Sequence, residues 1–136
     1  MKKISLLLAS TVIFLGLSGC SGTSDPGEAA VECMNGLKTG DIDMMNSCLT
    51  DSSQQLFKLQ ASVQCRSKDL NTEEGASNCY KKIFKPFDEF KSVNVKMDGE
   101  DSAIVTLEEY KKDGTIIKER IPMERFDGVW KINIHK

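Results

Sequence analysis

The sequence is poor in the residues and motifs that many enzymes use for catalysis. Its one histidine, His135, is the penultimate residue. It shares strand parity with Lys131 and Asn133, so we expect it on the polar side of its strand. The chain contains no phosphate-binding loop, no Gly-x-Ser-x-Gly elbow and no His-Glu-x-x-His helix motif. These absences exclude the common nucleotide-binding and hydrolase signatures, and we expect neither catalytic residues nor a cofactor.

Two further absences concern charge and hydrophobic length. Acidic residues outnumber basic ones, 20 to 18, so the chain lacks the basic excess that binding to nucleic-acid phosphates requires. The local basic group Lys81, Lys82 and Lys85 is expected to form a solvated helix face. The apolar run 4–17 is shorter than the roughly 20 residues of a transmembrane helix. We therefore expect neither nucleic-acid binding nor a membrane-spanning helix.

The N-terminus contains the pattern of a secretory signal. Lys2 and Lys3 precede the apolar run 4–17, as a positive n-region precedes an h-region. The run ends in LSGC, residues 17–20, which resembles the lipobox of bacterial lipoproteins. In those proteins small residues admit the chain to the lipoprotein signal peptidase, and the cysteine thiol is alkylated with diacylglycerol.

The lipobox resemblance implies that residues 1–19 are a cleaved signal peptide, that Cys20 is the lipidated first residue, and that 20–24 form a tether. Acyl chains such as palmitate contribute about 0.8 kcal/mol per buried methylene, so two or three chains anchor a protein stably. We therefore expect the membrane as a partner, through the lipid on Cys20, in a bacterial cell envelope. Ser21, in place of Asp, favours the outer membrane, facing the periplasm, in a cell with two membranes.

The mature chain has the length of a single domain. Removal of residues 1–19 deletes two lysines and no acid, which leaves 117 residues, 16 basic and 20 acidic side chains, and a formal net charge of −4. One hydrophobic core suits this length. We place the domain at residues 25–136.

Four cysteines remain after Cys20, and an even number in an oxidising compartment indicates two disulfides. Three connectivities are possible for Cys33, Cys48, Cys65 and Cys79. The spacing favours Cys33–Cys48 with Cys65–Cys79, because the first two lie nearly equidistant from the Gly-Asp turn at 40–41. A zinc site or a redox pair is the alternative, but both usually need closely spaced cysteines. We therefore expect no metal.

Apolar residues at helical spacing predict helices in the first half of the chain. We expect four helices. The first covers 25–39, a short second helix follows Asp41, and a third ends near residue 65. Residues 66–77 are expected to form a loop, and the fourth helix covers 76–85. Asp25 and Gly40 are the predicted caps of the first helix. The third helix rests on three apolar residues: Leu56, Leu59 and Val63.

The last 46 residues change to a period of two, which predicts strands with one buried face. Asp-Gly pairs at 98–99, 113–114 and 127–128 mark tight turns between strands. Together they predict a meander of four antiparallel strands. The residues expected to face the core are Val93, Val95, Met97, Ala103, Val105, Leu107, Trp130, Ile132 and Ile134.

Helices followed by a curved sheet that ends in FDGVWKINI, residues 126–134, resemble the nuclear transport factor 2-like superfamily and its small bacterial lipoproteins. The stretch PGEAAVECMNGLKTGDIDMMNSCL, residues 26–49, resembles their first two helices and the Gly-Asp turn between them. The resemblance implies an α+β fold whose four-stranded antiparallel sheet wraps around the long helix to form a cone. The mouth of such a cone holds a small ligand or is filled by side chains.

Enzymes of that superfamily, such as ketosteroid isomerase-like and dehydratase-like members, place an Asp or an Asp–His pair inside the cone. We do not expect such a site here. The glutamates of the predicted strands lie among basic residues, which favours cross-strand ion pairs on the solvent face: Glu108, Glu109, Glu119 and Glu124. Three aromatic residues can line a cavity but are expected in the core: Tyr80, Tyr110 and Trp130.

Three functions are compatible with these features. The leading expectation is a noncatalytic envelope lipoprotein whose domain binds another protein or a surface polymer. The alternative is binding of a small apolar ligand in the cone. An isomerase or dehydratase-like enzyme is the third hypothesis.

Replacement of Cys20 tests the predicted anchor. Cys20→Ser removes the thiol that lipidation requires, so the variant should not incorporate labelled palmitate and should retain its signal peptide. Radiolabelling and electrophoresis of fractionated host cells measure both effects, with Cys33→Ser as a control outside the lipobox. Processing and release equal to those of the natural chain would contradict lipidation.

Overall fold

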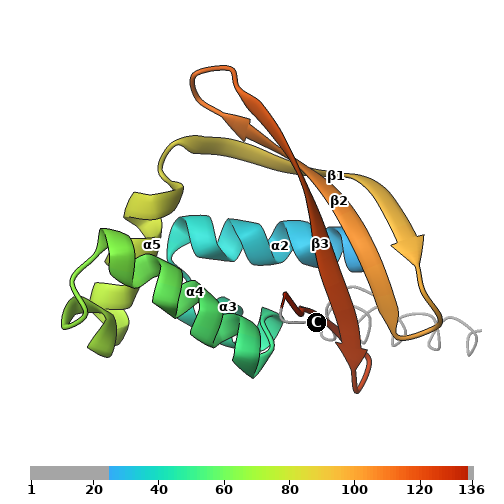
Figure 1. Ribbon diagram of the computed structural model, residues 1–136, viewed down its shortest axis with the longest axis horizontal. Coiled ribbons are helices and arrows are strands. Elements are labelled where there is room, and N and C mark those ends of the chain that lie inside the picture. Colours follow the sequence, from blue (N-terminus) through green and yellow to red (C-terminus); the bar gives the residue numbers. More distant parts are fainter. Residues whose placement is uncertain (1–24, 135–136) are drawn as a thin grey trace, which may run out of the picture.

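The computed structural model describes residues 25–134, in which helices precede a four-stranded sheet (Figure 1). The helices are α2 (Pro26–Thr39), α3 (Ile42–Cys48), α4 (Asp51–Gln64), the 3-10 helix η1 (Asp69–Asn71) and α5 (Glu73–Phe84). The strands are β1 (Phe87–Met97), β2 (Ser102–Lys111), β3 (Ile116–Phe126) and β4 (Val129–Ile132). This order confirms the α+β prediction. The predictions for Cys20 and His135 lie outside the described residues.

The first helix begins and ends where local chemistry places its ends. The Asp25 side chain accepts a hydrogen bond from the Gly27 N–H at 3.0 Å, and Gly40 follows the helix in the left-handed conformation, with φ 70°. The helix buries the face between these ends, formed by Ala30, Cys33, Met34 and Leu37.

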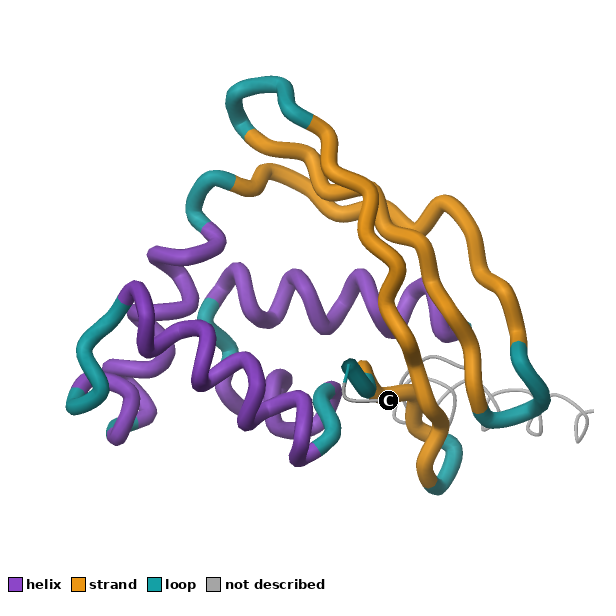
Figure 2. Tube along the Cα trace, in the orientation of Figure 1, coloured by secondary structure: helices purple, strands orange, loops and turns teal. Residues whose placement is uncertain are grey.

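The sheet is a meander in the order β1-β2-β3-β4, with every neighbouring pair antiparallel. Glycines with positive φ occupy the three predicted turns: Gly99, Gly114 and Gly128. Figure 2 shows the strands arching over α2, and the helix contacts all four of them. The core lies between this concave face and α2, and its largest fully buried side chains from the sheet are Val105, Leu107, Met123 and Ile132.

Two parts of the predicted helical region differ from the structure. Residues 66–77 are not one loop, because they contain η1 and the start of α5. The start of α5 is stabilised by Thr72, whose hydroxyl accepts from the Gly75 N–H at 3.0 Å. In α4 the apolar residues Leu59 and Val63 are exposed. The helix instead turns Ser53, Phe57 and Ala61 inward, at i, i+4 and i+8.

The expected burial of Val93, Val95 and Met97 is wrong, since these side chains are 46%, 36% and 48% exposed. A β-bulge between Ser92 and Asn94 interrupts the alternation of β1. Val95 and Met97 pair with buried residues of β2, but β1 is one of the two edge strands of the sheet. The strand alternation therefore predicted their face correctly and overestimated their burial.

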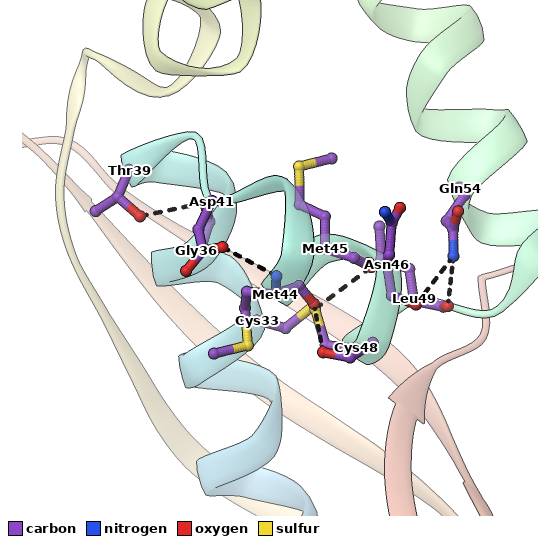
Figure 3. Close-up of a disulfide and its surroundings, with 11 residues drawn as sticks. Cys33, Gly36, Thr39, Asp41, Met44, Met45, Asn46, Cys48, Leu49 and Gln54 are labelled. Atoms are coloured by element: carbon purple, nitrogen blue, oxygen red, sulfur yellow. Dashed lines mark hydrogen bonds between the residues drawn. A yellow bond between two sulfur atoms is a disulfide. The ribbon is translucent and has the colours of Figure 1, made fainter. Parts of the chain in front are cut away.

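Two disulfides brace the helical half, with the connectivity that the spacing favoured. Cys33–Cys48 joins α2 to α3, with Cα atoms 5.6 Å apart (Figure 3). Cys65–Cys79 joins the end of α4 to α5, with Cα atoms 6.1 Å apart. All four sulfurs are therefore consumed in covalent bonds, which leaves none of these cysteines as a free thiol or zinc ligand.

Removal of the Cys33–Cys48 disulfide should lower the free energy of unfolding by about 3 kcal/mol, because a cross-link over this loop length restricts the unfolded chain. The double variant Cys33→Ala/Cys48→Ala tests this in urea under non-reducing conditions. Cys65→Ala/Cys79→Ala is the matched comparison, since its loop is one residue shorter, and Cys65 is only half-buried. Unchanged urea midpoints in both variants would contradict a stabilising role.

Candidate functional site

A cavity of about 320 Å³ lies between α4, the start of β1 and the concave face of the sheet. We call it the cone cavity. The side chains that line it come from every layer of the fold and are mostly apolar. They are Met34, Phe57, Gln60, Ile83, Phe84, Phe87, Glu109, Glu119, Arg120, Ile121, Pro122, Ile132 and Ile134. The cone is therefore not completely filled by side chains, although two disulfides brace it.

The apolar wall forms where α5 gives way to β1. Tyr80 and Phe84 are buried and Ile83 is half-buried. Phe87 follows at the start of β1, with its ring centroid 5.8 Å from that of Phe84 and 5.7 Å from that of Phe90. These aromatic contacts fix the side of the cavity that lies opposite α4.

One wall of the cone cavity contains a buried carboxyl group. Along β2, Ala103, Val105 and Leu107 point into the core, and Glu109 continues the same alternation. Glu109 is only 6% exposed. The expectation of a solvent-face position for Glu109 is therefore wrong, because strand parity places it inside while the neighbouring charges had suggested the opposite face.

Glu108 and Glu109 show how strand parity separates adjacent glutamates. Glu108 lies on the outer face, where its carboxylate is 3.9 Å from Lys118 Nζ and accepts a hydrogen bond from the Tyr110 hydroxyl. This confirms the cross-strand ion pair expected for Glu108. It also places Tyr110 outside the core, whereas Tyr80 and Trp130 are core residues.

Glu119 comes from β3 and completes an acid pair with Glu109. In the β2–β3 register Glu109 is opposite Ile117 and Glu119 is opposite Leu107, so the two glutamates are diagonal neighbours on one face. Their side chains share a hydrogen bond. Glu119 is exposed, so the pair runs from the cavity wall toward its mouth. The prediction for Glu119 is thus wrong about the face of the sheet, because its side chain lies on the concave face, but it is correct that the side chain is exposed to solvent.

The environment strongly favours the protonated form of Glu109. Burial is the largest cause, and the hydrogen bond and negative charge of Glu119 add to it, against a smaller opposing attraction from Lys111. Together they raise the pKa of Glu109 from 4.5 to about 8. The carboxyl group in the cone is therefore mostly neutral at pH 7.

One oxygen of this group has no hydrogen-bond partner. Among residues 25–134, Glu109 Oε2 is the one buried side-chain oxygen or nitrogen without a partner. A buried polar atom left unpaired costs about 1–3 kcal/mol, so such an atom in a cavity wall is a candidate contact for a ligand. Four other hollows, of about 340 to 480 Å³, lie among the helices, and their lining in the described part of the chain contains no such atom.

Two other kinds of site find no counterpart in residues 25–134. This part of the chain contains no cluster of three His, Cys, Asp or Glu side chains that could bind a metal ion. None of its helices is both long and apolar enough to span a bilayer.

Glu109 and Glu119 are the polar pair that the sequence reasoning missed. The alternation from Ala103 to Leu107 would have reached Glu109 if it had been extended by two residues.

Comparison with a solved structure identifies the architecture. A crystal structure of a Campylobacter jejuni protein described as a "Putative NTF2-like transpeptidase" matches 80% of this chain and 97% of its own, with a TM-score of 0.51 and 12% identity. At this identity the likeness shows the fold alone, and it confirms a nuclear transport factor 2-like (NTF2-like) fold.

A family model identifies the particular group. The model described as "Domain of unknown function (DUF4878)" matches residues 18–133, so the chain belongs to the DUF4878 family. No curated protein matches the sequence significantly.

The pKa of Glu109 predicts how stability depends on pH. The pKa of Glu109 in the folded chain, about 8, exceeds its ordinary value of 4.5. Between pH 4.5 and 8 the folded chain therefore binds one more proton than the unfolded chain. The contribution to the free energy of unfolding is complete below pH 4.5 and is lost as pH rises to about 8, with a slope up to about 1.4 kcal/mol per pH unit.

Glu109→Gln should remove this slope, because an amide does not titrate in this range. Urea unfolding at intervals between pH 4.5 and 8 measures the effect. Glu108→Gln, one residue away on the outer face, should retain the wild-type slope. Equal pH dependence of the wild type and Glu109→Gln would contradict the burial of an ionisable group at this position.

Proposed function

We propose that this protein is a lipid-anchored lipoprotein of the bacterial envelope whose cone cavity binds a small, mainly apolar molecule. The observation that carries the proposal is the apolar cavity with the unpartnered Glu109 Oε2 in its wall. Ligand sites are typically concave and apolar, with a few polar groups that orient the ligand. This observation favours the ligand-binding hypothesis over the protein or polymer partner that the sequence placed first.

The proposed anchor places the cavity outside the cytoplasm. The LSGC pattern ends at Cys20, and α2 begins at Pro26. A tether of this length spans at most roughly 20 Å when fully extended, so the lipid would hold the domain close to the membrane surface. In this proposal the ligand is a molecule of the envelope or its surroundings.

A second candidate function is proton transfer by the same acid pair. A carboxyl group with a raised pKa in an apolar cavity is what general acid–base catalysis at neutral pH requires. The hydrogen-bond donors in the described lining, Gln60 and Arg120, are exposed, whereas an oxyanion is stabilised by donors that the fold holds in place. We therefore favour noncatalytic binding. Turnover of a bound molecule that is abolished in Glu109→Gln would favour the enzyme instead.

Closure of the cavity mouth tests ligand binding. Gln60 is exposed on α4 and lines the cone cavity, so Gln60→Trp should obstruct the cavity without disturbing the core. Native mass spectrometry of the full chain from its own host should show a bound mass beyond the lipid, and its occupancy should fall several-fold in the variant.

Gln55→Trp is the matched control, because Gln55 is exposed on the same helix and does not line the cone cavity. It should retain the bound mass. A wild-type chain without any bound mass, or equal occupancy in both variants, would contradict the proposed function.

A further inference from the structure

The acid pair of the cone cavity contains a proton whose position can be assigned. Two adjacent carboxyl groups, one of them buried, do not both ionise readily, because burial and the neighbouring negative charge both penalise the ionised form. Glu109 is buried and Glu119 is exposed. Since burial penalises the charged form, the proton belongs to Glu109, and Glu119 keeps its negative charge in contact with water.

This proton leaves the cavity with an acceptor and not a donor. A protonated carboxyl group has a single O–H, which Glu109 can direct at Glu119, its diagonal neighbour on the same face. The buried oxygen Oε2 has no partner among residues 25–134, so with the O–H used in this way it accepts. A ligand that bears only acceptors, such as a ketone or a carboxylate, would leave Oε2 unsatisfied. A ligand that donates would satisfy it.

The pair also has a net negative charge that no cation of the described chain neutralises through an ion pair. The ion pairs within residues 25–134 join Arg66 to Asp69, Lys118 to Glu108 and Arg125 to Asp101. Lys111 attracts Glu109 electrostatically, but its ammonium lies over the Phe87 ring, 5.5 Å from the centroid. Arg120 lines the cavity from β3 without an ion pair to either glutamate in this part of the chain.

The donor that best fits an acceptor beside a negative charge is a cation. Hydrogen bonds with a charged donor are roughly twice as strong as those between neutral groups. Phe57, Phe84 and Phe87 also line the cavity, and aromatic rings attract cations through their faces. A cavity of about 320 Å³ lies at the lower end of the usual range for ligand pockets.

We propose that the ligand of the cone cavity is a small apolar amine, bound in its protonated form, whose N–H donates to Glu109 Oε2 close to the Glu119 carboxylate. Its apolar part contacts Met34, Phe84 and Ile121. This inference rests on the proposed ligand-binding function and adds the charge of the ligand to it.

A pair of isosteric probes tests the charge directly. 2-Phenylethylamine and 2-phenylethanol have the same apolar part, and only the amine is cationic at pH 7. Calorimetric titration of the purified full chain should give a Kd for the amine at least ten-fold lower than that for the alcohol. Equal Kd values, or the absence of amine binding, would overturn the inference.

Variants of the acid pair identify the source of the preference. Glu109→Gln/Glu119→Gln preserves side-chain volume and the capacity for a mutual hydrogen bond, but it removes the charge. The ten-fold preference of the amine over the alcohol should fall to less than two-fold. Glu109→Gln alone keeps the charge of Glu119 and should retain most of the preference. Glu108→Gln, on the outer face, should retain all of it, and thermal unfolding verifies that each variant is folded.

The outcomes separate this inference from the proposed function. If the preference for the amine persists in the double variant, the acid pair does not recognise the cation and the inference is overturned. If the amine fails to bind but the native bound mass is present and is lost in Gln60→Trp, ligand binding stands and only the amine assignment fails. If the native bound mass is absent as well, both fail.

Discussion

Burial of one face of α2 against the concave side of the sheet is the constraint on which the rest of the structure depends. The helix contacts all four strands, which a flat sheet could not achieve around a single helix, so the strands must curl. Gly27 allows close approach, because an added Cβ would lie 2.5 Å from Ser92 Oγ of β1, and Leu37 is fully buried. Complete burial of a side chain such as Leu contributes roughly 1.5–3 kcal/mol, so this interface fixes the cone and its interior.

The helix α4 forms one wall of the cone cavity and is attached to the fold at both of its ends. At its beginning, the Thr50 N–H donates to the Ile132 carbonyl at 3.1 Å, and the Ser53 hydroxyl accepts from the Ile134 N–H at 2.9 Å. At its end, Cys65 is bonded to Cys79. Between these attachments Phe57 and Gln60 face the sheet across the cavity. The disulfides therefore help to fix the wall of the cone and do not close it.

Glu109 is the point where stability and the proposed function oppose each other. A carboxyl group with an unpaired buried oxygen destabilises an apolar wall, and an apolar side chain of similar size would fill the same place at lower cost. The NTF2-like architecture supplies the concave face, but the likeness in fold does not specify a ligand. The recognition chemistry that we propose thus depends on two side chains, Glu109 and Glu119. It does not depend on the fold, which this protein shares with others.

The sequence by itself determined the class of the fold, because its signals are local. Helical spacing, the Asp25 and Gly40 caps and the three Asp-Gly turns depend on neighbouring residues alone. Tertiary structure decided which faces are buried. A single bulge changed the parity of β1, β1 remained an exposed edge, and the β2–β3 register brought Glu109 and Glu119 together on the concave face. Charge patterns along the chain could not predict that pair, since the burial of a strand residue depends on what packs against its face.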